Sequence, residues 1–381
     1  MEKIPLWRDS RFIKIVGQVV VLAIVVSAIA FLANNLVNNF QRLNLTFGYN
    51  FLSRPSSFGI ANPPISYRPT DPYLRALIIG LLNSLRIMFF GIIFASIIGI
   101  TVGIGRLSDN WLVKKLAGFY VEVLRNTPLL LQLFFWYFAV FLRLPKIDSP
   151  LIVGNIFLLT NRGLDIPWDE LNIRTGLGLL AIIGCVLLGI LGWNKRIQAI
   201  EEGQNTQQWF WILIGSAIAT IGIFCFGIDW SFPQLENRVI QGGLNLSPEF
   251  ATLLIGLSVY TAAFIAEVVR AGIQSVSKGQ WEASRALGFK PSLMMQLIIF
   301  PQALRVMIPP LTSEFLNLAK NSSLAIAIGY SDIYAIGNTI SNQTGKSVEI
   351  LLIFMTVYLT INLIISTIMN RFNRLVQNNF N

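Results

Sequence analysis

The sequence contains no histidine among its 381 residues and only two cysteines, Cys185 and Cys225. Without histidine, the commonest metal ligand and a frequent general base are both missing. The two cysteines lie inside apolar runs, so they indicate neither a disulfide framework nor a metal site. We also find no nucleophile–base or metal-ligand constellation in the rest of the chain. We therefore expect a protein that is not an enzyme and that binds no metal.

Charged residues are also scarce, at 13% of the chain, whereas soluble domains carry about a quarter. Apolar residues make up 54%, and they are grouped into runs long enough to cross a bilayer as helices. Short alternating segments, which are typical of a membrane β-barrel, are not found. Helices are expected because every backbone polar group must be paired inside the lipid. The predicted fold class is an all-α, polytopic membrane bundle.

About eight transmembrane helices are predicted. Their approximate ranges are 12–33, 77–104, 119–142, 176–193, 209–228, 250–269, 304–324 and 348–369. The first run is longer than the apolar core of a signal peptide, and no clear cleavage site follows it, so we interpret it as a retained span.

The formal net charge of +10 does not by itself indicate nucleic-acid binding, because basic residues gather in the cytoplasmic loops of membrane proteins. With the N-terminus inside, the inner segments hold more Lys and Arg per residue than the outer ones. These inner segments are 1–11, 105–118, 194–208, 270–303 and 370–381. We therefore expect both termini in the cytoplasm, membrane lipid as the surroundings, and no nucleic-acid partner. The outer segment 145–175 fits least well, since it also carries basic residues.

The second predicted span carries small residues every four positions, at Gly91, Ala95, Gly99 and Gly103. This spacing places them on one helix face, where another helix can approach closely. We interpret the stripe as a packing surface.

The segment 280–310 has the sequence QWEASRALGFKPSLMMQLIIFPQALRVMIPP and begins without a long apolar run. Residues 281–287 include several good helix formers. Gly288 suits a helix C-terminus, and Pro291 suits the first turn of the next helix. We expect a short helix in an inner loop, followed by a helix that enters the membrane.

This segment resembles the conserved cytoplasmic loop of ABC importer permeases, whose pattern is Glu-Ala-Ala, three residues, Gly, nine residues, Ile, two residues, Pro. The matching positions are Glu282, Ala283, Ser284, Gly288, Ile298 and Pro301. Ser284 replaces the second alanine, and Phe300 stands where leucine is common. In that family the short helix docks into a groove of the cytoplasmic ATPase. The resemblance implies an ATPase-coupling role for Glu282, Ala283, Ser284, Gly288 and Pro301. Ile298 matches the pattern, but no role is assigned to it.

Other segments are similar to polar amino acid permeases of the histidine/glutamine type. These segments are 83–86, 120–122, 125–128, 260–267 with Arg270, and 320–324. The likeness covers about 76–372, with 145–248 inserted relative to five-span members. The remaining parts are an extra N-terminal helix with its outer loop, 1–75, and a cytoplasmic tail, 373–381. This organisation is similar to the larger permeases of general L-amino acid uptake systems.

The resemblance implies a type I ABC importer core and a permease subunit that moves amino acids across a bacterial inner membrane. The implied partners are a cytoplasmic ATPase that binds ATP, a second permease, expected to be a different chain, and an external binding protein. This chain itself is expected to hold no cofactor. Gly345-Lys346-Ser347 looks like the end of a P-loop, but Ile340 stands where the first glycine is needed.

A polar stripe interrupts the seventh predicted span, because Glu314, Asn317 and Asn321 are spaced at i, i+3 and i+7. Ionisable groups at membrane depth are costly and usually face the bundle interior or water. In one hypothesis the stripe, with Lys320 and Ser322, lines a substrate passage in which the carboxylate meets an ammonium group. In the alternative, Lys320 reaches the outer surface and the amides join neighbouring helices.

Glu267 and Arg270 lie one turn apart near the inner end of the sixth predicted span, and we favour an intramolecular ion pair or a gate-side packing role over contact with the substrate. A competing function is a secondary transporter driven by an ion gradient, which uses broken helices near the midplane. Pro309-Pro310, close to Glu314, is compatible with such a break. The loop at 280–301 favours the ABC importer, since a secondary carrier has no need of an ATPase dock.

Overall fold

The computed structural model describes residues 10–42, 46–154, 156–168, 172–236 and 239–378. Within these residues, seven helices are long and apolar enough to cross a membrane, and a bent pair of helices makes a possible eighth span. Six of them are α1 (Ser10–Arg42), α2 (Tyr73–Gly105), α5 (Ile173–Glu201), α6 (Gln207–Phe226), α7 (Pro248–Gln274) and α12 (Ser347–Asn378). The seventh is the continuous helical stretch Pro291–Ile328, whose central part is α10 (Phe300–Asn321). The predicted class, a polytopic helical bundle with about eight spans, is confirmed.

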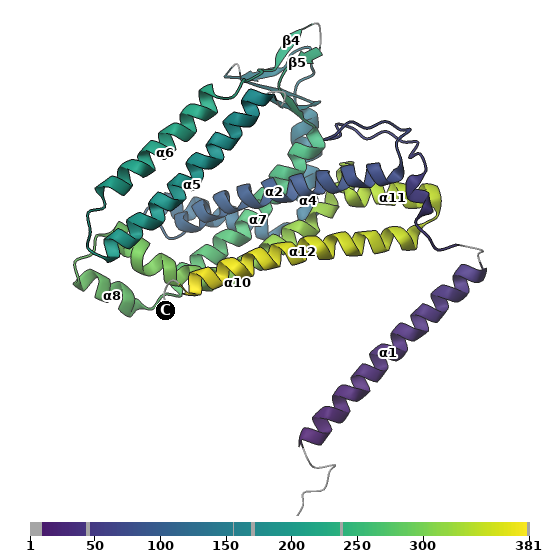
Figure 1. Ribbon diagram of the computed structural model, residues 1–381, viewed down its shortest axis with the longest axis horizontal. Coiled ribbons are helices and arrows are strands. Elements are labelled where there is room, and N and C mark those ends of the chain that lie inside the picture. The colour runs from purple at the N-terminus through teal and green to yellow at the C-terminus, as the bar shows by residue number, and fades with distance from the viewer. Residues whose placement is uncertain (1–9, 43–45, 155, 169–171, 237–238, 379–381) are drawn as a thin grey trace, which may run out of the picture.

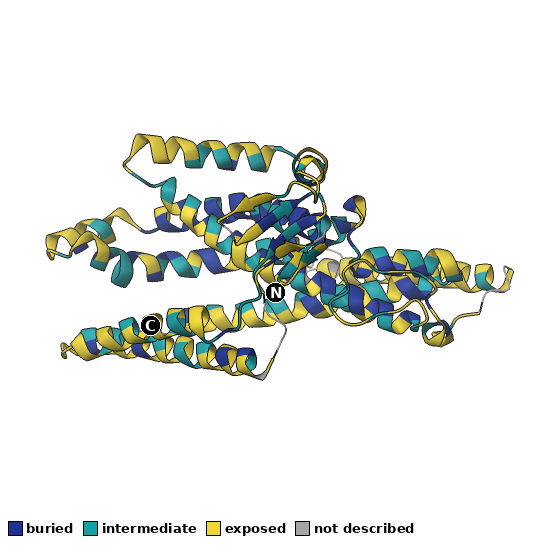
Figure 2. Cartoon of the chain, turned by 90° about the horizontal axis from the view of Figure 1, so that it is seen from above, coloured by how far each residue is buried: buried dark blue, intermediate teal, exposed yellow. Residues whose placement is uncertain are grey.

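The centre of the bundle is the contact between α2 and α7, which the stripe of small residues makes possible. A Cβ added to Gly99 would lie 2.6 Å from Ile265, and one added to Gly103 would lie 2.8 Å from the carbonyl oxygen of Ala266. Glycine is therefore needed at both positions for the two helices to approach. The predicted packing role of this stripe is confirmed, and Figure 2 shows the buried residues gathered in the interior of the bundle.

The predicted span 119–142 is not one straight helix. It consists of α3 (Trp111–Asn126) and α4 (Leu129–Phe134), continued by a π-helical turn (Phe135–Val140) and a short 3₁₀ turn (Phe141–Arg143). The two halves are bent by 106°. Pro128 has no backbone N–H and disfavours helical backbone in the preceding residue, and Thr127 is extended. The Gln132 side chain donates to the carbonyl oxygens of Leu124 (2.9 Å) and Thr127 (3.1 Å), which the break leaves without helical partners.

The inserted segment contains β-strands that the sequence analysis did not predict. β1 (Leu151–Val153), β2 (Phe157–Thr160), β3 (Gly163–Ile166) and β6 (Leu244–Leu246) form an antiparallel sheet in that order. β4 (Gln234–Glu236) and β5 (Val239–Gln241) form a separate hairpin. Between β3 and β6, helices α5 and α6 pack on each other as an antiparallel pair. In Figure 1 the strands lie at the end of this pair away from α8 (Lys278–Ala286), and we call these two ends of the molecule the sheet end and the α8 end.

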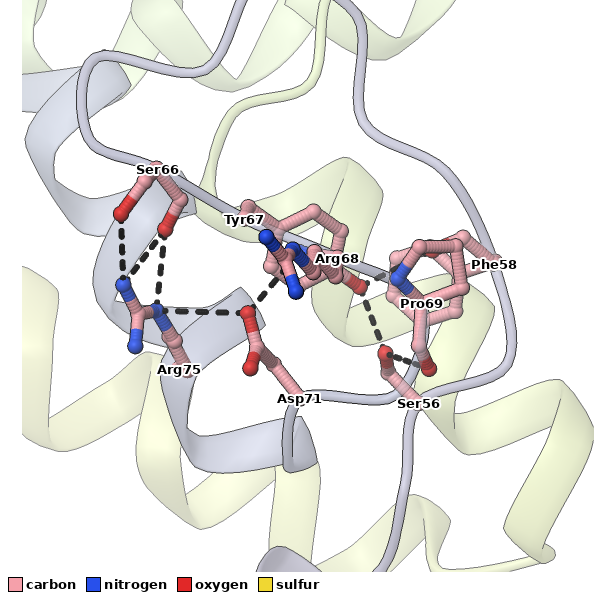
Figure 3. A network of polar contacts seen from close by, with 8 residues as sticks. All are labelled: Ser56, Phe58, Ser66, Tyr67, Arg68, Pro69, Asp71 and Arg75. Atoms are coloured by element: carbon pink, nitrogen blue, oxygen red, sulfur yellow. Dashed lines mark hydrogen bonds and ion pairs between the residues drawn. The ribbon is translucent and has the colours of Figure 1, made fainter.

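The loop that precedes α2 is irregular, as predicted for this proline-rich stretch, but its side chains fix its course. The Ser56 hydroxyl lies 2.6 Å from the Tyr67 hydroxyl, which donates to the carbonyl oxygen of Phe58 at 3.0 Å. Arg75 at the start of α2 contacts Asp71 at 3.5 Å (Figure 3). These contacts close the loop upon itself beside the sheet end of α2.

Helix α1 is exposed along nearly all of its described length, whereas the described chain from Thr46 onward is held by contacts with the start of α12. The Lys346 ammonium donates to the carbonyl oxygen of Thr46 and lies 3.2 Å from the buried carboxylate of Glu349. That carboxylate also accepts from the backbone N–H of Gly48 at 3.1 Å. The chain shortly after α1 is thus held at the first turn of α12. The cytoplasmic location predicted for the two termini concerns residues 1–9 and 379–381, which lie outside the described residues.

Candidate functional site

The segment predicted to couple to an ATPase forms the expected short helix, α8, at one end of the bundle (Figure 1). Gly288 follows it with a positive φ of 73°. The N–H of Phe289 donates to the carbonyl oxygen of Ser284 at 3.2 Å, and that of Gly288 to Arg285 at 2.9 Å, which is the Schellman pattern. Helix α9 (Pro291–Met294) then begins at Pro291, as predicted. The local conformation inferred from the sequence is confirmed.

The five predicted coupling residues divide into two groups. Glu282, Ala283 and Gly288 are exposed, whereas Ser284 and Pro301 are buried within the chain itself. The Ser284 hydroxyl donates to the carbonyl oxygen of Gln280 at 2.5 Å, so it stabilises the loop and leaves no free group for a partner.

Leu287 was not singled out from the sequence, yet it is 76% exposed beside Gly288. A single exposed apolar side chain is common on protein surfaces, so Leu287 supports a docking role only together with the motif around it. Trp281 packs instead on the bundle core, so α8 has one face toward the bundle and one face free.

Glu267 is the centre of a charge cluster near the α8 end. It forms ion pairs with Arg270, one turn along α7, and with Arg106, just after α2. Arg125 of α3 is a third cation, with Nη1 4.0 Å from the same carboxylate. The predicted Glu267–Arg270 pair is confirmed. Arg106 and Arg125 were missed, because helices distant in sequence bring them to Glu267.

Glu314 on α10 is half-buried and lies one turn before Asn317 on the same helix. It lies close enough to Tyr260 of α7 and to Arg125 of α3 to interact with both electrostatically. Three helices thus meet at this carboxylate. Among the other members of the predicted stripe, Asn321 is half-buried and Lys320 is exposed.

Two further features of the stripe matter for its interpretation. Asn317 is exposed on the surface of this chain, while the hydroxyl of the buried Ser322 donates to the carbonyl oxygen of Ala319 at 2.8 Å. The stripe therefore opens on one side of α10, and Ser322 belongs to its buried end. Pro309 and Pro310 lie inside α10 without ending it, so the helix break that a secondary carrier would use is absent from this stretch.

Arg125 connects the Glu314 site to the Glu267 cluster. Its guanidinium carbon lies 5.2 Å from the ring centroid of Phe264, between the levels of Tyr260 and Glu267 on α7. Seven residues of helix rise about 10 Å, so one arginine reaches both levels. Because Arg125 stands near the bend between α3 and α4, a change in that bend would alter its ion pair with Glu267 and its electrostatic interaction with Glu314.

Comparisons with known proteins extend over almost the whole chain. The profile of the family described as "Binding-protein-dependent transport system inner membrane component" matches residues 91–378. The putative amino-acid ABC transporter permease YhdX of Escherichia coli K12 is 43% identical over 363 residues, which cover 94% of this chain and 92% of that protein. The general L-amino acid transport system permease AapQ of Rhizobium johnstonii is 41% identical over 371 residues, covering 96% and 92%.

One solved structure, titled as an amino acid ABC transporter with histidines, is similar with a TM-score of 0.48 and 22% sequence identity. The alignment covers 79% of this chain and 94% of that chain.

Proposed function

Since the chain belongs to the family of binding-protein-dependent transport system inner membrane components, we infer that it is the permease subunit of an ABC importer for amino acids. The observation that carries this inference is the similarity to amino-acid permeases over more than nine tenths of the chain, at about 40% identity. The chain is a multi-pass protein of the inner membrane. Its role is transport rather than catalysis.

We propose that ATP is bound and hydrolysed by a separate ATPase that docks on α8. The free face of this helix carries Glu282 and Ala283, and Leu287 projects beside them. The buried Ser284 and Pro301 support the same loop from inside. The motif match, the exposed face and the position of α8 at one end of the bundle all favour this role.

We propose that the α8 end faces the cytoplasm, with both termini on that side. Lys278, Arg285 and Lys290 lie at this end, as the positive-inside rule requires of a cytoplasmic loop. The sheet end then faces outward, where an external binding protein delivers the amino acid. A second permease chain, different from this one, would complete the pathway, and the open stripe on α10 is the surface that we assign to it.

The function is tested by transport in liposomes that contain the complete complex, with the binding protein outside and ATP inside. We expect accumulation of radiolabelled L-amino acids only when ATP and a hydrolysis-competent ATPase are present. An ATPase partner unable to hydrolyse ATP is the matched control. Accumulation driven by a sodium or proton gradient without ATP would support the secondary-transporter alternative and contradict the proposal.

We propose that Glu314, Asn317 and Asn321, with Lys320 and Ser322, mark the substrate passage. Glu314→Gln keeps the shape of the side chain and removes its charge. If the carboxylate meets the ammonium group of the substrate, uptake should fall by about tenfold, the effect of roughly 1.4 kcal/mol, while complex yield and ATPase docking stay unchanged.

A separate variant, Asn317→Leu, tests the amide that the same proposal places in the passage and leaves the carboxylate intact. Uptake is normalised to assembled complex, so that a packing defect appears as lost complex rather than as slow transport. Normal uptake by Glu314→Gln across several amino acids would contradict charge recognition.

A further inference from the structure

A cavity of about 590 Å³ opens at the sheet end of the molecule. Its walls come from the loop around Asn62, from Trp168 and the β6 strand in the inserted segment, and from α2 and α7 of the bundle. The side-chain N–H of Asn62 donates to the side-chain oxygen of Asn245 at 3.2 Å, which joins the loop to β6. The contacts drawn in Figure 3 hold the same loop in place. The volume lies within the range of roughly 300–1,000 Å³ that small-molecule sites occupy.

The charge of this cavity is positive. Arg86 is the single charged residue among the described residues that line it. Within the described part of the chain no carboxylate lies within ion-pair distance of Arg86. Its guanidinium carbon sits 5.0 Å from the ring centroid of Phe250 instead. A guanidinium stacked on an aromatic face keeps its N–H edge free, and that edge fits a carboxylate in a bidentate arrangement.

A second feature of the cavity also favours an anion. Ser247, which lines it, is the N-cap of α7, a helix of 27 residues. The N-terminal end of such a helix carries a partial positive charge. Glu249, the acidic residue of this first turn, accepts a hydrogen bond from the Tyr137 hydroxyl at 2.9 Å and is not part of the lining. The carboxylate of Glu249 offsets much of this helix-end charge, so the guanidinium of Arg86 supplies most of the attraction for an anion.

We propose that this cavity receives the α-carboxylate of an incoming amino acid, with Arg86 as the residue that binds it. The proposal rests on the transport function and the orientation inferred above. Phe250 and Tyr260 are ten residues apart on α7, so this site lies about 15 Å before the level of Glu314. An amino acid would meet a cation first and a carboxylate second on its way along α7. In this proposal the inserted segment has a function, because its Trp168 and β6 form one wall of the carboxylate-binding cavity.

Thiol labelling in intact cells that express the full transporter tests the proposal. Ala61→Cys, in a background where Cys185 and Cys225 are serine, places one thiol on an exposed part of the lining. We expect the anionic reagent sulfonatoethyl methanethiosulfonate to react faster than its cationic trimethylammonium counterpart. Arg86→Gln should reduce this ratio by about fivefold, as the loss of one nearby charge requires. Arg143→Gln, an exposed arginine outside the cavity, should leave the ratio unchanged.

The ligand is tested by protection in the same assay. Free L-amino acids at millimolar concentration should slow labelling, whereas their α-amides, which keep the side chain but lack the carboxylate, should not. Arg86→Lys keeps the charge but loses the planar fork, so the reagent preference should remain while protection weakens. Absence of protection with Arg86 intact would overturn the proposal even if Arg86→Gln failed to reach the membrane. Equal protection by the α-amides would also overturn it, because the carboxylate would then not be the group that the cavity binds. In both of these outcomes ATP-driven uptake should persist, so the proposed transport function is tested separately.

Discussion

Gly288→Val is expected to reduce ATP-driven uptake by at least about tenfold while the amount of membrane-inserted chain stays near that of the parent. Gly288 has a φ of 73°, and no atom lies within 4 Å of where its Cβ would be. The cost of a larger residue is therefore conformational, about 1–3 kcal/mol for a non-glycine residue held in this region. The chain can avoid that cost by opening the Schellman turn, which would move α8 and its exposed Leu287 relative to the bundle.

A graded series identifies the cause of this effect. Asparagine tolerates the left-handed region better than alanine, and a β-branched side chain tolerates it least, so uptake should decrease in the order Gly, Asn, Ala, Val. Gly279→Val is the matched control, since Gly279 lies on the same helix with open space around it and no positive φ. Co-purification of the ATPase is measured beside uptake. Full assembly and full uptake in Gly288→Val would remove this glycine from the coupling mechanism.

Glu267→Gln is expected to lower both uptake and the amount of assembled complex. The carboxylate faces the guanidinium groups of Arg106, Arg125 and Arg270, and its side chain is 26% exposed. Removing one partner of a buried ion pair costs about 3–5 kcal/mol, and the partial exposure of this cluster places its cost below that range, at roughly 1–3 kcal/mol. Three cations near the α8 end would then repel one another without a counter-charge.

A second substitution distinguishes repulsion among the three arginines from a packing defect at residue 267. Arg125→Gln in the Glu267→Gln background should recover part of the lost complex, because one of the repelling cations is removed. Asp109→Asn, an exposed carboxylate on the connection after α2, is the control and should leave complex yield unchanged. If the double variant were no more abundant than Glu267→Gln, charge balance would not be what stabilises this end of the bundle.

The sequence predicted those parts of the molecule in which the signal is local. Apolar runs located the spans, the four-residue spacing from Gly91 to Gly103 predicted a packing face on α2, and Gly288 marked the end of α8. The Glu267–Arg270 pair was predicted for the same reason, because its members lie one helical turn apart. The roles assigned to the coupling loop and to the stripe on α10 stay predictions.

The missed features depend on pairing between distant segments. Arg106 reaches Glu267 across 161 residues, and no pattern within a window of one helix could show that contact. Strands of three or four residues, such as β3 and β6, are too short for alternation of apolar and polar residues to be recognised. The bend at Thr127-Pro128 did carry a local signal, since proline disfavours a helical conformation in the residue before it. The span 119–142 was nevertheless predicted as one helix, because its apolar residues form a run long enough to cross the membrane.

The pairing of β3 with β6 also sets an order of events while the chain is being made. The side-chain N–H of Asn245 in β6 donates to the carboxylate of Asp165 in β3 at 2.8 Å although 80 residues separate them, and both spans of the inserted segment lie between. The sheet therefore stays incomplete until α5 and α6 have both been threaded through the bilayer and β6 has emerged behind them. Because the two helices pack on each other, they can enter the lipid as a pair before α7 is synthesised. The sheet can therefore close only after both helices have crossed the membrane. If synthesis stopped before β6, the cavity beside Arg86 would lack one of its walls.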